Sequence, residues 1–302
     1  MQNNKTPYWY YILALVPPLM GALNYVASKY VISDISPTSL LFYRWFSALI
    51  ILTPFVLKGF ISEFKAIKRN MGILTIVAVS SVGAAFFCNY SLKYTTSTNT
   101  AIVTSVFPVF VLFLGVVIHK DKLQKIQLFS MILALVGAVI IISHGHILRG
   151  IDGLFHNIGD FIALASAISL AIYCISVKSK PKNISLNSFA YSTLLIGTIL
   201  ILPLYLCDVF YFGNTFKLNV PNVSVIIFLG LGVSIIGMMI MNVTVLKIGS
   251  NIISILFYAT PLFTAMMAVT VLGEQFEAFH FVGMGLIIAG VNLPLILRPI
   301  LK

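Results

Sequence analysis

Residues 107–122 read FPVFVLFLGVVIHKDK, and residues 260–275 read TPLFTAMMAVTVLGEQ. The two stretches align at an offset of 153 residues, about half of the 302-residue chain. Pro108 then pairs with Pro261, and Asp121 pairs with Glu274. Small and apolar residues fall at matching places between these pairs, so the chain repeats one pattern.

The repeat extends beyond these stretches. Gly137 in LALVGAVII matches Gly290 in LIIAGVNLP at the same offset of 153, and Pro54 in ILTPFVL matches Pro203 in ILPLYL at an offset of 149. A one-residue slip also aligns YSLKYTTSTN with TVLKIGSN. We therefore divide the chain into two similar units, residues 1–148 and residues 149–302.

The composition is that of a membrane protein. Hydrophobic residues make up 59% of the chain, charged residues make up 9%, and the mean hydropathy is +1.03. Soluble domains are typically about 25% charged, and uncharged apolar runs of about 20 residues are candidate membrane helices. We predict an all-α membrane protein with ten transmembrane helices, near residues 8–28, 38–58, 71–91, 98–118, 126–144, 159–178, 187–207, 223–246, 251–272 and 279–298.

The basic residues indicate the orientation of these helices. With the N-terminus inside, the inner segments hold 14 of the 19 Lys and Arg residues and the outer segments hold 4. Cytoplasmic loops carry such an excess of Lys and Arg. We therefore expect both termini in the cytoplasm, and we interpret the net charge of +11 as a match to anionic lipid and not to nucleic acid.

Each unit holds five predicted helices, and five is odd, so the second unit enters the membrane from the opposite face. The charges agree, because the loop after the first copy, HKDKLQK, is basic and the loop after the second, GEQFEAFH, is acidic. The sequence thus predicts two inverted-topology repeats. In secondary transporters this architecture lets one half rock against the other around a midplane site, which gives alternating access.

The paired stretches, together with MGALNYVASK at Met20–Lys29, resemble the paired EamA domains of the drug/metabolite transporter superfamily. Gly21, Asn24 and Lys29 match the family's Trp-Gly…Asn…Lys signature, and an Arg, here Arg44, follows in the second segment. The resemblance implies export of small metabolites, commonly amino acids or drug-like compounds, across a bacterial inner membrane. Met20 stands in place of the signature Trp. Leu170 stands where the sixth segment of relatives often carries a second Trp. In relatives both positions are expected to line the substrate path.

Arg44 is the one charged residue well inside a predicted segment. It is a candidate counter-ion for a substrate carboxylate or phosphate. Alternatively it snorkels or binds helix-end carbonyls and so fixes the second segment, which is the interpretation that we favour from the sequence. Lys29, at the outer end of the first segment, either anchors the helix at the interface or contacts the substrate as part of a gate.

Uncharged polar residues inside the apolar segments are further candidates for substrate binding. Asn24 and Tyr25 lie in the outer half of the first segment, and Tyr173 matches Tyr25 at an offset of 148. Pro108 and Pro261 each remove a backbone hydrogen bond and are predicted hinges beside a pocket. Helix–helix hydrogen bonding is the alternative role for all the polar candidates. The remaining candidates are Asn89, Thr104, Asn242, Ser254 and Tyr258.

A secondary transporter of a small amphipathic metabolite is the preferred function. A membrane-embedded enzyme or lipid-handling protein is the alternative, and a channel is a third. Enzymes of this kind need clustered carboxylates or a Ser-His-Asp set, and the sequence indicates neither; we expect no cofactor, no metal site and no catalysis. Asp160 is the nearest candidate for proton coupling, but a helix N-cap is the role that we favour for it from the sequence. The expected partners are the substrate, the lipid bilayer and, in a homodimer, a second copy of the chain.

Overall fold

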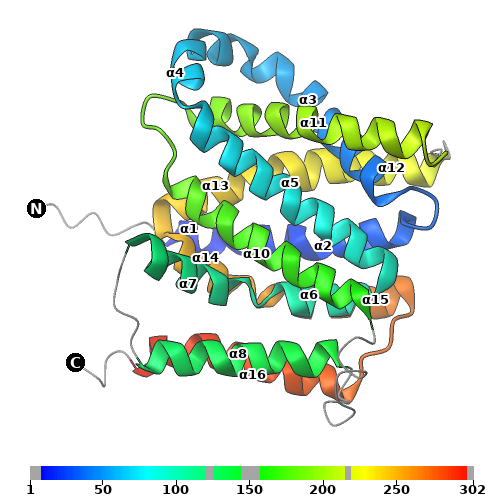
Figure 1. Cartoon of the computed structure of the whole chain (residues 1–302), viewed down its shortest axis with the longest axis vertical. Coiled ribbons are helices and arrows are strands. Elements are labelled where there is room, and N and C mark those ends of the chain that lie inside the picture. The colour runs from blue at the N-terminus through cyan, green and yellow to red at the C-terminus, as the bar shows by residue number, and fades with distance from the viewer. Residues whose placement is uncertain (1–7, 120–124, 144–156, 215–218, 298–302) are drawn as a thin grey trace, which may run out of the picture.

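The computed structural model describes residues 8–119, 125–143, 157–214 and 219–297, and every regular element in these ranges is a helix (Figure 1). In the first half of the chain the helices are α1 (Trp9–Leu13), α2 (Val16–Val31), α3 (Pro37–Ser62), α4 (Phe64–Arg69), α5 (Met71–Tyr94), α6 (Ser97–Thr104), α7 (Phe107–His119) and α8 (Lys125–Ile142). In the second half they are α10 (Ile158–Lys178), α11 (Leu186–Phe210), α12 (Val220–Phe228), the π-helix η2 (Leu229–Gly237), α13 (Met238–Ile248), α14 (Ser250–Leu256), α15 (Ala259–Leu272) and α16 (Ala278–Leu297). The linker predicted at 145–158 lies almost wholly outside the described residues.

Seven helical stretches among the described residues are long and apolar enough to cross a membrane. They are Trp9–Val31, Pro37–Ser62, Met71–Tyr94, Ser97–Ile118, Ile158–Lys178, Leu186–Phe210 and Val220–Ile248. Three shorter apolar helices, Ile132–Ile142, Ala259–Leu272 and Ala278–Gly290, fall where the fifth, ninth and tenth crossings are predicted. The chain is therefore an all-α, multi-pass membrane protein.

Proline interrupts three of the predicted segments. The first divides into α1 and α2 just before Pro17, the fourth divides into α6 and α7 just before Pro108, and the ninth divides into α14 and α15 before Pro261. Proline lacks the N–H that the preceding turn would need, and it fits the first turn of a new helix. The breaks beside Pro108 and Pro261 thus occupy matching places in the two halves of the chain.

The eighth predicted segment has no proline break, but its middle third, η2, winds as a π-helix. π-Helical turns are rare and often occur at functional sites. Here η2 packs closely on α3: a Cβ added to Gly230 would lie 2.3 Å from the Ser47 hydroxyl oxygen and 3.1 Å from the Arg44 carbonyl oxygen. Glycine at this position lets the two backbones approach, and this brings η2 beside the Arg44 side chain.

Two serine–carboxylate contacts hold α3 and α11 together in antiparallel orientation. Ser36, the N-cap of α3, donates its hydroxyl to Asp208 near the end of α11. At the opposite end, the N–H and the hydroxyl of Ser185, the N-cap of α11, donate to Glu63 Oε2 at 2.9 and 3.1 Å. We name the two ends of the molecule the Asp208 end and the Glu63 end.

The last pair of helices, α8 and α16, lies side by side at one edge of the bundle (Figure 1). Glycine allows this contact, because a Cβ on Gly137 would lie 2.6 Å from the carbonyl oxygen of Gly283, and a Cβ on Gly283 would lie 2.8 Å from that of Gly137. Membrane helices associate closely through such small residues.

Candidate functional site

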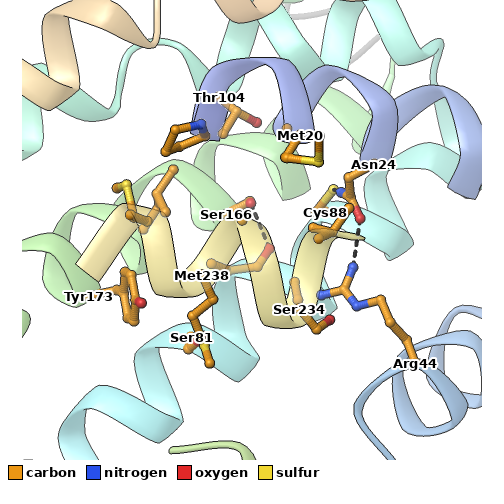
Figure 2. A pocket seen from close by; sticks show the side chains of 18 of the residues that line it. Met20, Asn24, Arg44, Ser81, Cys88, Thr104, Ser166, Tyr173, Ser234 and Met238 are labelled. Atoms are coloured by element: carbon orange, nitrogen blue, oxygen red, sulfur yellow. Dashed lines mark hydrogen bonds between the residues drawn. The ribbon is translucent and has the colours of Figure 1, made fainter. Parts of the chain in front are cut away.

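A cavity of about 170 Å³ lies among helices from both halves of the chain (Figure 2). Its wall is formed by Pro17, Met20, Gly21, Asn24, Tyr25, Arg44, Trp45, Ser81, Ala84, Ala85, Cys88, Thr104, Ser166, Leu170, Tyr173, Leu194, Val233, Ser234, Gly237, Met238, Met241 and Phe257. Within the described part of the chain, this wall includes one charged side chain, Arg44, and no Asp, Glu or His. The cavity is therefore mostly apolar with a few polar groups, as small-molecule sites usually are.

Arg44 is the eighth residue of α3 and is only 5% exposed. Its Nη1 donates to Asn24 Oδ1 at 2.6 Å, and Asn24 Nδ2 in turn donates to the Cys88 sulfur at 3.6 Å (Figure 2). These contacts fix the Asn24 amide with its oxygen toward the guanidinium. The bond to Asn24, on α2, differs from the helix-end clamp that we favoured from the sequence.

Four potential donors in the cavity wall are buried and have no hydrogen-bond partner among the described residues: Arg44 Nε, Trp45 Nε1, Thr104 Oγ1 and Ser234 Oγ. Arg44 and Trp45 come from α3, and Ser234 comes from η2. A buried donor without a partner costs about 1–3 kcal/mol, and more when it is charged. The wall thus offers unsatisfied donors to a bound molecule.

Tyrosine hydroxyls occupy two other parts of the wall. Tyr25 on α2 lies beside Thr104 on α6. Tyr173 on α10 donates its hydroxyl to Asn242 Oδ1 on α13 at 2.5 Å. The two tyrosines paired in the sequence therefore both border the cavity, and each contacts a polar side chain on another helix.

Several predicted site residues line the cavity, and one more contacts a residue of the cavity wall. Asn242 does not form part of the wall but binds the wall residue Tyr173. The predicted residues that line the cavity are Asn24, Tyr25, Arg44, Thr104 and Tyr173.

Other predicted residues lie away from the cavity wall. Asn89 is fully buried, and its amide donates to the Pro37 carbonyl oxygen at 3.4 Å, so it contributes to helix–helix contact instead. Tyr258 is buried in an apolar cluster that includes Val106 and Ile287. Pro108 and Pro261 lie in the first turns of α7 and α15. The side chain of Ser254 lies outside the described residues.

Lys29, for which the sequence left open an anchoring role and a gate role, binds a helix end and is not part of the cavity wall. Its Nζ donates to the carbonyl oxygens of Leu92 and Thr95, both at 2.7 Å. These carbonyls belong to the last turn and the C-cap of α5. A cation is favourable at the C-terminus of a helix because the helix dipole is negative there.

Sequence reasoning did not select most of the apolar wall. Met20 and Leu170 depart from the family pattern at positions that are expected to line the substrate path in relatives, and both line the cavity. Cys88, which was not among the predicted site residues, lines it as well. Nothing in the sequence indicated that Trp45, Met238 and Met241 line a cavity. An apolar side chain in an apolar helix can face lipid, the protein core or a cavity, and the sequence pattern is the same in each case.

At the Asp208 end, a carboxylate from one half of the chain caps a helix of the other half. Glu274 follows α15 and accepts four hydrogen bonds at the start of α6. The Ser97 N–H and hydroxyl donate to Oε1 at 2.7 and 2.8 Å, and the Thr98 N–H and hydroxyl donate to Oε2 at 3.0 and 2.7 Å. An anion at a helix N-terminus satisfies free N–H groups and complements the dipole.

A second carboxylate at this end is fully buried between the halves. Asp160, in the first turn of α10, accepts from the Thr95 hydroxyl at 2.7 Å and from Asn99 Nδ2 at 3.4 Å. The side-chain Oδ1 of Asn99 lies 2.7 Å from His280 Nε2 on α16. The N-cap role considered for Asp160 belongs instead to Asn157, whose side chain accepts from the Gly159 N–H.

Comparisons with known proteins identify one matching family and several similar transporters. The EamA-like transporter family matches residues 8–143 and residues 157–295. An uncharacterized transporter from Archaeoglobus fulgidus is 26% identical over 96% of this chain and 97% of its own length. The uncharacterized transporter YetK of Bacillus subtilis is 25% identical over 76% of this chain and 69% of its own. One crystal structure shares the fold, with a TM-score of 0.62 at 15% identity over 96% of this chain and 98% of that one.

The two family matches meet at the cavity. The match over 8–143 contains Asn24, Arg44 and Thr104, and the match over 157–295 contains Tyr173 and Ser234. With its apolar helices and its repeated family domain, the chain belongs to the EamA-like transporter family and is a multi-pass membrane transporter.

Proposed function

We propose that this protein is a secondary transporter that exports a small amphipathic metabolite across a bacterial inner membrane by alternating access. One observation carries the proposal: the central cavity is lined by both halves of the chain, with a few polar groups among methionine, tryptophan and leucine side chains. A site shared between two halves changes its accessibility when the halves rock against each other.

The inverted arrangement of ten helices is part of this proposal, with one repeat in residues 1–148 and the other in residues 149–302. The reciprocal contacts of α3 and α11 support it. Ser36 caps α3 and binds the acid near the end of α11, whereas Ser185 caps α11 and binds the acid that follows α3. A two-fold axis in the membrane plane would exchange α3 with α11 and would therefore exchange these two contacts.

The proposed orientation places both termini in the cytoplasm. The excess of basic residues in the segments at the Glu63 end supports it. In Figure 1, α1, α4 and the C-terminal end of α16 all lie toward the left side of the view, while the start of α12 lies on the right side. The Asp208 end is then the outer end, and the Glu63 end is the inner end.

Alternating access requires the contacts at each end to break in turn. At the outer end, the capping of α6 by Glu274 and the burial of Asp160 against Thr95 and Asn99 connect the two halves. The interruptions beside Pro108 and Pro261 separate the outer parts of the fourth and ninth segments from their inner parts. We propose that these two positions act as hinges while the outer contacts open and close.

Side-specific cysteine labelling tests the function and the topology together. In a variant in which Cys88, Cys174 and Cys207 are replaced by alanine, a single cysteine is placed at Ser81 or Ser166 in the cavity wall, and an impermeant maleimide is applied to either face. Both positions should react from both faces. Control cysteines at Lys65 on α4 and at Phe212 after α11 should react only from the cytoplasmic face and only from the outer face, respectively.

The same assay separates a transporter from a channel. Glu274→Ala should weaken the outer contact, so labelling at Ser81→Cys should become faster from outside and slower from inside. In a channel both rates would rise together. Labelling of the cavity from one face alone, or of Lys65→Cys and Phe212→Cys from the same face, would contradict the proposal.

An enzyme or lipid-handling protein remains the alternative, and no specific observation favours it. Among the described residues no group of three or more His, Cys, Asp or Glu side chains could hold a metal ion. Within the cavity wall, the described groups that could exchange a proton with a substrate are tyrosine hydroxyls and the Cys88 thiol. Transport is therefore the function that the geometry supports best.

A further inference from the structure

Arg44 lacks a counter-ion in the part of the chain that the structure describes. The residue is 95% buried, and its guanidinium binds the neutral amide of Asn24, while Nε has no hydrogen-bond partner there. Glu63, Asp160, Asp208 and Glu274, in contrast, each accept hydrogen bonds at one end of the molecule, away from the cavity wall. A buried unpaired charge is strongly unfavourable, so the cavity favours a bound anion.

Trp45 adds a second donor that packing holds in place. A Cβ added to Gly197 on α11 would lie 2.0 Å from Cζ3 and 2.7 Å from Cε3 of the indole ring, so the benzene edge fills the space that this glycine leaves. The indole N–H lies on the opposite edge of the ring and has no partner among the described residues. Because an indole N–H can only donate, it calls for an acceptor such as a carboxylate oxygen.

Ser234 supplies a third donor from the other half of the chain. Its hydroxyl is buried in the cavity wall without a partner in the described ranges. It lies on η2, whose close packing against the Arg44 backbone at Gly230 places the two residues on neighbouring helices. Figure 2 shows both side chains projecting from these helices at the cavity.

The rest of the cavity wall suits a ligand whose remaining part is apolar and carries no positive charge. Met20, Met238, Met241, Leu170 and Phe257 contribute apolar side chains, and the described wall offers no carboxylate to pair with an ammonium group. An engineered apolar cavity of about 150 Å³ holds one benzene molecule. The volume of about 170 Å³ thus matches one ring with a short substituent.

We propose that the cavity binds a monocarboxylate with a single apolar ring or a branched chain of similar size and without an ammonium group. The carboxylate accepts from Arg44, Trp45 and Ser234, and the apolar body contacts the methionines. This inference rests on the proposed function, because it names the substrate class of the transporter. A zwitterion would leave its ammonium unpaired, and a cation would be repelled by Arg44.

Four probes with the same phenyl ring test the proposal on the purified full-length protein in lipid nanodiscs. Phenylacetate, phenylacetamide, 2-phenylethylamine and phenylalanine are anionic, neutral, cationic and zwitterionic, and calorimetric titration at neutral pH gives their affinities. Phenylacetate should bind at least tenfold more tightly than each of the others. No binding of phenylacetate, or equal binding of phenylalanine or 2-phenylethylamine, would overturn the proposal.

Matched variants locate the carboxylate. Arg44→Gln should weaken phenylacetate binding at least tenfold, and Arg44→Lys should give an intermediate loss, because lysine keeps the charge without the planar fork. Trp45→Phe keeps a ring but removes the N–H, and it should weaken binding about tenfold. If Arg44→Gln does not fold, Trp45→Phe still decides the question. The controls Arg69→Gln and Trp9→Phe change the same residue types outside the cavity wall and should leave the affinity unchanged.

Counterflow of labelled phenylacetate in proteoliposomes separates the two proposals. Tight, Arg44-dependent binding without counterflow would contradict the transport function and leave the anion site intact. Counterflow of 2-phenylethylamine or phenylalanine without binding of phenylacetate would support transport and overturn the anion site. Affinity that is the same in wild type, Arg44→Gln and Trp45→Phe would place the carboxylate elsewhere and would also overturn the inference.

Discussion

The two ends of the α3–α11 pair use the same local sequence with different surroundings. Residues 35–39 read ISPTS and residues 184–188 read ISLNS, at an offset of 149. In both stretches the isoleucine is buried. The first serine of each caps a helix and binds a carboxylate at the end of the other helix. Asp208, however, is 8% exposed, whereas Glu63 binds Ser185 at an exposed position.

Burial decides how much each contact contributes. Asp208 accepts from the Ser36 and Ser39 hydroxyls and from Asn214, so a buried carboxylate there is well satisfied. An exposed ionic contact is screened by water and contributes about 0–1 kcal/mol. The Asp208 end also holds the Glu274 and Asp160 contacts. We therefore expect the described conformation to be held more firmly at the Asp208 end than at the Glu63 end.

The largest effect should come from Glu274→Ala, which removes four hydrogen bonds and leaves the N–H groups of Ser97 and Thr98 buried at the start of α6. Hydrogen bonds to charged groups contribute about 1.5–3 kcal/mol each and are not additive, so we expect a loss of roughly 3 kcal/mol. The thermal unfolding midpoint of the purified protein measures it. Glu277→Ala, a neighbouring exposed acid, is the control. Equal midpoints for the two variants would mean that Glu274 does not hold the halves together.

Asp208→Asn should have a smaller effect. The amide keeps the volume of the carboxylate, and the hydroxyls of Ser36 and Ser39 can turn to accept from it, but the charge at the N-terminus of α3 is lost. We expect about 1–2 kcal/mol of destabilisation. Cys207→Ser, at the adjacent exposed position, controls for changes at this turn. A midpoint as high as that of the wild type would show that burial of Asp208 adds nothing to this contact.

Glu63→Gln should have the smallest effect, below about 1 kcal/mol at neutral pH. Partial burial raises the pKa of Glu63, but hydrogen bonds from Ser185 and Ser188 and the charge of Lys180 outweigh it, so the pKa lies below the ordinary value of 4.5. A carboxyl group with a lowered pKa stabilises the fold above its unfolded pKa, and this contribution is lost as the pH falls through the folded pKa.

The difference in unfolding midpoint between wild type and Glu63→Gln should therefore be constant above about pH 5 and disappear at more acidic pH. Ser185→Ala, alone and combined with Glu63→Gln, gives the coupling between the two side chains. A loss at Glu63 as large as that of Glu274→Ala would remove the asymmetry between the two ends.

The place of a residue along its helix could be predicted from the sequence, but the side of the helix on which it lies could not. Asn89 and Cys88 are neighbours in α5, yet Cys88 lines the cavity while Asn89 binds the α3 backbone. Lipid and protein core are both apolar, so the α5 sequence carries no amphipathic stripe to separate the two directions. For the same reason Tyr25 and Tyr258 seemed equivalent, although only Tyr25 reaches the cavity.

The sequence alone determined the class of the protein, the repeat, the family and the positions of the proline breaks, because these depend on composition, on local backbone chemistry and on spacing along one chain. The tertiary structure decided which distant groups meet. Glu274 reaches the start of α6, 177 residues away in the chain, and Arg44 meets Asn24 instead of a helix end. Such contacts depend on how helices rotate and pack against one another, and packing in an apolar solvent is set by the fit of side chains across helices and not by the hydrophobicity of any one of them.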